Sequence, residues 1–139
     1  MKQSKTWLRP IILMAVLLAA SSSAVAGVVA IVNIANTSAD RSTISRLYTG
    51  EAKSWSDGTS AKLYDLSDES ARDEFCKAYT GKSAGVIKTG WAKAVFTGRA
   101  VPPKMLDSDR DVKNEVSKDK NAVGYVNESS VDGSVRVVR

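Results

Sequence analysis

Residues 28–34 read Val-Val-Ala-Ile-Val-Asn-Ile, a continuous apolar run in which most side chains are β-branched. Such a run is typical of a strand covered on both faces, because a strand with one face in water alternates apolar and polar residues. The polar tripeptide at 36–38 (Asn-Thr-Ser) ends the run. The sequence therefore predicts a buried strand at the start of the folded domain.

After this strand, segments with helical periodicity alternate with further strand-like segments. Three serines are placed to cap helices, and Gly50, Gly81 and Gly98, the last followed by Pro102-Pro103, stand where helices should end. The predicted helices follow Ser42, Ser67 and Ser108, with a further one at 86–96, and the predicted strands are 63–66, 122–126 and 134–138. In the helix after Ser67, the apolar face should comprise Ala71, Phe75, Ala78 and Tyr79. This alternation is typical of an α/β domain.

The segment before the strand has the order of a secretory signal. Lys2, Lys5 and Arg9 precede an uncharged apolar run at 11–20, and Ala24-Val25-Ala26 follows. The run is shorter than the ~20 residues that a membrane span needs. We expect residues 1–26 to be cleaved and 27–139 to form one domain that is not inserted in a membrane. Cleavage removes three basic residues, so the net charge falls from +5 to +2 and does not favour nucleic-acid binding.

The composition excludes several kinds of catalytic or metal site. The chain has no histidine, which excludes histidine triads and histidine metal sites, and a single cysteine, Cys76, which excludes an internal disulfide. We interpret Cys76 as a small buried side chain. The acidic residues at 65–74 lack the spacing of a calcium loop, and Gly81-Lys82-Ser83 lacks the strand and the first glycine of a phosphate-binding loop. With no paired nucleophile and base, we expect no enzyme, no metal and no cofactor.

Several short stretches occur in an order that resembles one protein family. They are 27–33, the I-x-x-L-Y-x-G-x-x-x-x-W-x-D-G pattern at 44–58, 70–75, Pro102-Pro103 and Ala-Val-Gly-Tyr-Val at 122–126. Together they resemble the phosphate-binding proteins of bacterial phosphate ABC transporters, and specifically their small, single-lobe relatives. The resemblance implies one lobe of a type 2 periplasmic-binding-protein fold, with a mixed sheet and flanking helices, in the periplasm of a Gram-negative bacterium.

The resemblance also implies where an anion would bind. Alignment on Phe75 places residues 65–71 over the family's phosphate loop, roughly R-x-D-G-S-G-T, so that Asp65 stands at the family's arginine position. The implied phosphate ligands that remain are Ser67, Ser70 and Arg72, with Asn33, Asn36, Thr37 and Ser38 across the cleft. Asp68 and Glu69 stand where a dianion should bind and would repel it.

Two functions therefore stay open at the level of the sequence. The first is binding of phosphate or a related oxyanion, linked to an ABC permease. The second is a non-transport interaction module of a cell-envelope assembly or signalling system that has lost anion binding. An exported hydrolase is a weaker third hypothesis, because no nucleophile has a base beside it.

Overall fold

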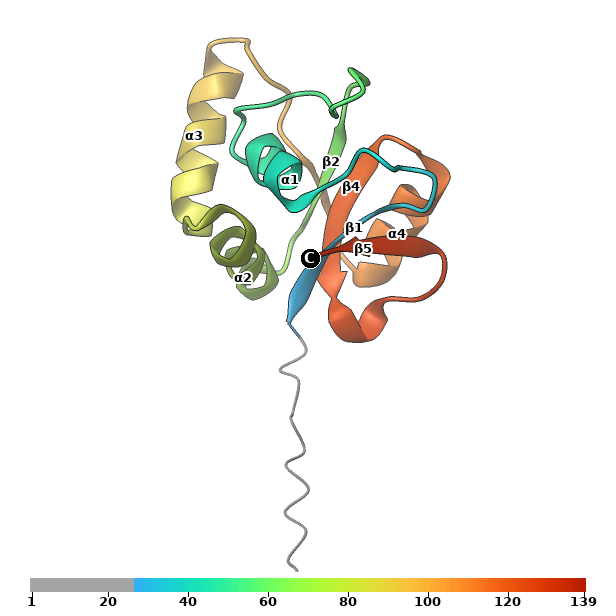
Figure 1. Ribbon diagram of the computed structural model, residues 1–139. Helices are drawn as coiled ribbons and strands as arrows, with labels where there is room; N and C mark the ends of the chain where they lie inside the picture. The colour runs from blue at the N-terminus through green and yellow to red at the C-terminus, as the bar shows by residue number, and fades with distance from the viewer. Residues whose placement is uncertain (1–26) are drawn as a thin grey trace, which may run out of the picture.

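Residues 27–139 are described by a computed structural model, and the predicted signal peptide at 1–26 lies outside them. Within this range, five strands form one sheet in the order β3-β2-β4-β1-β5, with four α-helices around it (Figure 1). The strands are β1 (Val28–Asn33), β2 (Lys62–Leu66), β3 (Lys104–Leu106), β4 (Ala122–Asn127) and β5 (Val135–Val138). The helices are α1 (Arg41–Tyr48), α2 (Glu69–Thr80), α3 (Ala84–Phe96) and α4 (Asp109–Lys118), and a 3₁₀ turn spans Glu128–Ser130.

The sheet is mixed, and the direction of its strands decides where each candidate residue lies. β2 runs parallel to β3 and β4, whereas β1 runs antiparallel to β4 and β5. Val123 of β4 pairs with Val32 near the end of β1 and with Leu63 near the start of β2. The carboxyl end of β1 therefore lies at the opposite end of the sheet, along the strand direction, from the carboxyl end of β2.

Helices cover both faces of the central strands. The ribbon shows α4 on one side of the sheet and α1, α2 and α3 on the other (Figure 1). Val112 and Val116 of α4 are fully buried, and they pack over Gly124, where an added Cβ would come within 2.4 Å of Val112 Cγ1. All six residues of β1 are buried, as predicted from its continuous apolar run.

Aromatic rings fill the core beneath α1 and α2. The ring of Phe75 stacks on Tyr125 at a centroid distance of 4.1 Å and on Tyr79 at 4.8 Å, and it meets Tyr48 edge-on at 4.8 Å. Such pairs add to the free energy of burial. The buried hydroxyls are also satisfied, because Tyr48 donates to the carbonyl of Tyr64 at 2.7 Å and Tyr79 to that of Val138 at 2.6 Å.

Three local predictions are wrong and one strand was not predicted, each for a local physical reason. The N-caps of α1 and α2 are Asp40 and Asp68 rather than Ser42 and Ser67, since in both cases a nearby carboxylate accepts the N–H bonds of the first turn. Ala78 is exposed, because the buried stripe of α2 recurs at four-residue spacing through Ala71, Phe75 and Tyr79. The three-residue strand β3 was not predicted, because its pattern is too short to show. Ser108 caps α4 as predicted.

Candidate functional site

The amino terminus of α2, directly after β2, is the position that the sequence indicated for an anion. Asp68 precedes the helix in an extended conformation, and its Oδ1 accepts the N–H bonds of Ser70 at 3.0 Å and Ala71 at 3.2 Å. The first N–H groups of a helix are the donors that a phosphate at such a terminus takes. In this chain the carboxylate of Asp68 already holds two of them.

The remaining residues of this loop give a mixed set of groups. Ser67, Ser70 and Glu69 are all exposed, and the Ser67 N–H is used in a bond to the carbonyl of Leu106 at 2.9 Å. The two serine hydroxyls could bind an anion, but Asp68 and Glu69 lie between them in the chain. The loop therefore combines hydrogen-bond donors with two carboxylates that oppose a phosphate dianion.

Arg72, the third predicted ligand of this group, lines a cavity beneath α3. The cavity holds about 170 Å³ and is lined by Tyr48, Asp65, Arg72, Cys76, Trp91 and Met105, among others. Arg72 Nε is buried and has no hydrogen-bond partner among the described residues. Arg72 is thus one turn into the helix, beside Asp65, with one donor free.

Asp65 is the acidic residue that lines this cavity, and its surroundings shift its pKa. Burial raises the pKa of its carboxyl, while the hydrogen bond from the Tyr125 hydroxyl at 2.8 Å and the charge of Arg72 act to lower it. The family position that holds an arginine therefore holds, here, a partly buried acid tied to β4. Sequence reasoning missed the role of Tyr125, because its contact with Asp65 joins two strands that are far apart in the chain.

Cys76 lies in the same cavity wall and behaves as predicted. Its thiol is free and buried, and burial raises its pKa to about 11. A thiol is nucleophilic only as the thiolate, so this cysteine is an inert packing residue at neutral pH.

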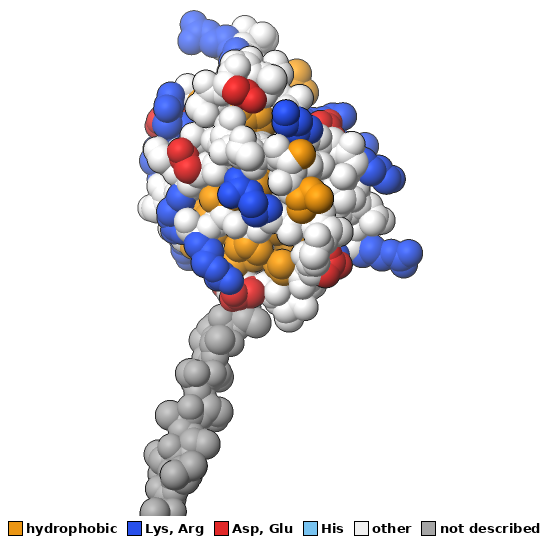
Figure 2. Space-filling model, turned by 45° about the vertical axis from the view of Figure 1, so that its right-hand side comes forward, with side chains coloured by type: hydrophobic (Ala, Val, Ile, Leu, Met, Phe, Trp, Pro, Cys, Tyr) orange, Lys and Arg blue, Asp and Glu red, His pale blue; other side chains and the backbone are white. Residues whose placement is uncertain are grey.

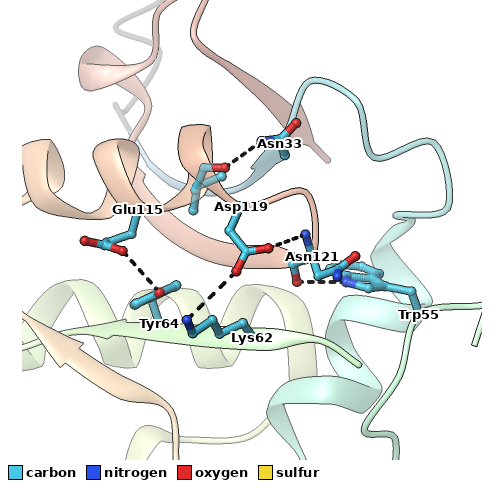
Figure 3. Close-up of polar contacts among 8 residues, drawn as sticks. Asn33, Trp55, Lys62, Tyr64, Glu115, Asp119 and Asn121 are labelled. Atoms are coloured by element: carbon cyan, nitrogen blue, oxygen red, sulfur yellow. Dashed lines mark hydrogen bonds and ion pairs between the residues drawn. The ribbon is translucent and has the colours of Figure 1, made fainter. Parts of the chain in front are cut away.

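The second predicted group follows β1 and lies at the other end of the sheet. Figure 3 shows Asn33 there, together with the contacts among Lys62, Asp119, Asn121 and Trp55. The Asn33 amide donates to the carbonyls of Val116 at 3.0 Å and Ser117 at 3.1 Å. These are carbonyls at the carboxyl end of α4, which have no partner within the helix. Asn33 therefore ties β1 to α4.

Of the next three predicted residues, Asn36 and Ser38 also make hydrogen bonds within the fold. Asn36 is buried, its Oδ1 accepts the Ser38 N–H at 3.0 Å, and its carbonyl accepts a bond from Arg136 at 2.7 Å. Thr37 is exposed. The group after β1 and the group after β2 do not face one cleft of this chain. The two strands run in opposite directions, so their carboxyl ends lie at opposite ends of the sheet. A single ion cannot contact both.

Neither a metal centre nor a membrane-spanning helix is found among the described residues. No group of three or more Cys, Asp or Glu side chains within 27–139 is arranged to hold a metal ion. Over the same range, no helix has the length and apolarity to cross a bilayer.

Comparison with known proteins places the fold. No protein-family model matches the sequence, and no curated protein matches it significantly. A solved protein of Clostridium perfringens, described as a putative phosphate ABC transporter substrate-binding protein with bound phosphate, is 22% identical with a TM-score of 0.61, over 81% of this chain and 44% of that one. An ABC-type phosphate transport receptor from Vibrio cholerae is 20% identical with a TM-score of 0.52, over 81% and 45%. A possible phosphate binding protein from Planctomyces limnophilus is 13% identical with a TM-score of 0.54, over 81% and 40%.

The chain thus spans less than half the length of the solved proteins that it matches. At this level of identity the likeness shows the fold. The predicted fold class, an α/β lobe of the periplasmic-binding-protein type with a mixed sheet and flanking helices, is confirmed. The matched proteins are binding proteins of the kind that the sequence motifs indicated.

Proposed function

We propose that this chain, which has the fold of part of the phosphate-binding proteins of ABC transporters, is an exported, non-enzymatic binding module. It keeps the lobe as a scaffold and acts through its surface, rather than by taking up phosphate at the amino terminus of α2. One observation carries the proposal: Asp68 Oδ1 accepts the Ser70 and Ala71 N–H groups that an anion would need.

The energetics of the loop favour this function. A phosphate at α2 must displace the Asp68 carboxylate from its capping bonds, and loss of such a cap costs about 1 kcal/mol. The displaced carboxylate and that of Glu69 then stay near the dianion. Two unit charges of like sign at 4 Å repel by about 1 kcal/mol even in bulk water, and a dianion doubles this for each carboxylate. The hydroxyls of Ser67 and Ser70 offer neutral hydrogen bonds worth about 1 kcal/mol each.

Binding of phosphate or a related oxyanion for an ABC permease is the second candidate. It draws support from the solved neighbours, one of which holds phosphate, and from the free Nε of Arg72. Because the chain spans less than half of those proteins, this function calls for the rest of the clamp beside this lobe. Under it, Ser67, Ser70 and Arg72 remain the proposed ligands.

Calorimetric titration of phosphate into the processed chain, freed of carried-over phosphate, separates the two candidates. We expect no saturable heat up to millimolar phosphate. The double variant Asp68→Gly, Glu69→Ser exposes the first N–H groups of α2 and removes both carboxylates, so it should gain saturable binding. Glu51→Ser removes an exposed carboxylate between α1 and β2 and serves as the matched control, which should show no saturable phosphate binding.

Saturable binding by the unmodified chain at micromolar phosphate, weakened by Arg72→Ala, would instead establish the oxyanion function. Export is tested separately, by mass spectrometry of the amino terminus of the protein recovered from the periplasm. We expect the chain to begin at Gly27. A start at Met1 would contradict the predicted cleavage.

A further inference from the structure

Helix α3 is apolar, yet it buries none of its side chains fully. Ile87, Trp91 and Ala94 lie half-buried on its inner side, whereas Phe96 is 93% exposed and Val86 is 57% exposed. The segment after it adds Val101 at 86% and Met105 at 46%. Apart from Ile34, every large apolar side chain that is exposed in residues 27–139 lies between positions 86 and 105. Val95 and Phe96 line one shallow hollow together with Trp91 and Pro102, and an exposed apolar patch of this kind marks a contact site.

The charges that α3 and the segment after it carry are all of one sign, and the nearest carboxylates come from other elements: Asp73 of α2 accepts the Ala84 N–H, and Asp65 lies in the cavity on the inner side of the helix. The sequence from Phe75 to Leu106 contains no Asp or Glu. We call α3 surface the set Val86, Val95, Phe96, Val101 and Met105 with the cations Lys88, Lys93, Arg99 and Lys104. The face seen in Figure 2 differs, since acidic and basic side chains both stand around its apolar atoms.

The apolar part of the α3 surface lies at the periphery of the fold. In Figure 1, α3 is the outermost helix of its layer, and its carboxyl end leads into a loop at the edge of the domain. Trp91, Ala92, Val95, Phe96 and Pro102 line a shallow groove there, with Lys88 beside it. The side chain of Lys53 donates to the Arg99 carbonyl, which adds a further cation beside the loop.

A second copy of the chain is a poor partner for this surface. A symmetric dimer through α3 would bring the cations of one copy against the same cations of the other, and like charges disfavour such a contact. A head-to-tail contact needs an apolar face elsewhere on the molecule. In the described residues, Ile34 is the one large exposed apolar side chain outside positions 86–105.

We propose that the α3 surface binds peripherally to an anionic phospholipid bilayer. In this arrangement Phe96 and Val101 enter the interface, and Lys88, Lys93, Arg99 and Lys104 contact headgroup phosphates. A bilayer supplies negative charge and an apolar layer together, without requiring a matched protein shape. The inference rests on the proposed function, in that an exported surface-binding module meets such a bilayer.

The test is sedimentation of the processed chain with vesicles. Vesicles of phosphatidylcholine alone are compared with vesicles that also contain phosphatidylglycerol at about one lipid in three. We expect binding to the anionic vesicles only, weakened as salt rises from 0.1 to 1 M because screening shortens the reach of the charges. Phe96→Ser should lower the partition coefficient at least about tenfold. Lys93→Gln and Arg99→Gln should each lower it about fivefold.

Matched controls lie elsewhere on the surface. Ile34→Ser removes an apolar side chain that is 63% exposed, and Lys120→Gln removes an exposed cation outside the α3 surface, and neither should change binding. Because Phe96 is 93% exposed, its variant should keep the far-ultraviolet circular dichroism of the parent. No sedimentation with anionic vesicles, or sedimentation that Phe96→Ser leaves unchanged, would overturn the proposal.

Two further outcomes would also overturn it. Equal binding to neutral vesicles would remove the role of the cations. A dimer in analytical ultracentrifugation that Phe96→Ser dissociates would show that a second copy covers the surface. Vesicle sedimentation and phosphate titration are independent measurements. If the chain does not bind vesicles, calorimetry still decides whether the amino terminus of α2 binds phosphate.

Discussion

The hydroxyl of Tyr125 in β4 donates a hydrogen bond to Oδ1 of Asp65 in β2 at 2.8 Å and accepts one from the Leu66 N–H at 3.1 Å. The two strands pair through their backbones only at Lys62 and Leu63. Beyond that point β2 pairs only with β3, and on its other side the hydroxyls of Tyr125 and Tyr48 reach its backbone in place of β4. A side chain thus holds the end of β2, from which α2 starts.

Tyr125→Phe should test the strength of this link. The variant leaves the buried Leu66 N–H without its acceptor and Asp65 without its donor, so we expect a loss of about 2 kcal/mol in the free energy of unfolding. Urea unfolding measures it. Tyr64→Phe is the matched control, since that hydroxyl lies 3.4 Å from Glu115 in a partly exposed position and should cost well under half as much. Equal losses in the two variants would contradict the assigned role of Tyr125.

The free energy of unfolding should depend on pH in part through the ionisation of Asp65. Burial raises the pKa of this carboxyl above its unfolded value of about 3.9. Its favourable contribution is then fully present below that unfolded value and is lost as the pH rises through the folded pKa. Asp65→Asn keeps an acceptor for Tyr125 and carries no charge. We expect this variant to gain stability relative to the parent between pH 3 and 7, measured by urea unfolding at each pH.

Asp132→Asn is the control of opposite sign. Hydrogen bonds from Ser134 and Lys113 lower the pKa of the Asp132 carboxyl, so its contribution is present above the unfolded pKa and is lost as the pH falls. The difference between this variant and the parent should therefore grow as the pH rises from 3 to 7, to the disadvantage of the variant. The same trend in both variants would show that neither site controls the pH profile.

The N-cap of α2 can be assigned by a pair of neighbouring variants. Asp68 accepts two N–H bonds of the first turn, whereas Ser67 is exposed outside the cap. Asp68→Ala should therefore lower the free energy of unfolding by about 1 kcal/mol, and Ser67→Ala should change it by no more than a few tenths. Thermal or urea unfolding of both variants decides the point, and the reverse order would restore Ser67 as the cap.

Close packing of α4 on β4 depends on a glycine. A Cβ added at Gly124 would lie 2.4 Å from Val112 Cγ1, and Val112 is fully buried. Gly124→Ala should cost about 2 kcal/mol, because the helix or the strand must shift to admit the methyl group. Gly133→Ala is the control, since nothing lies within 4 Å of its added Cβ. An unchanged unfolding midpoint in Gly124→Ala would show that α4 moves freely.

Local signals in the sequence were enough for most of the elements. The apolar run at 28–33 predicts a strand buried on both faces, and Ser108 predicts the start of α4, because each signal lies within the element that it describes. Val95 shows the limit: its spacing from Ile87 and Trp91 suggests one apolar face, yet it is 41% exposed. Four-residue spacing identifies a helical stripe, but it does not say whether another layer covers it.

The site divides in the same way. The sequence by itself determined that residues 65–71 hold three carboxylates where the resembling family has an arginine, a glycine and a serine, and it indicated the fold class. The tertiary structure alone decided that Asn33 lies at the opposite end of the sheet from Ser67, that Arg72 turns beneath α3 beside Asp65, and that α3 is left uncovered. The physical reason is that strand direction, and the layer that buries a helix face, are set by pairing between segments far apart in the chain.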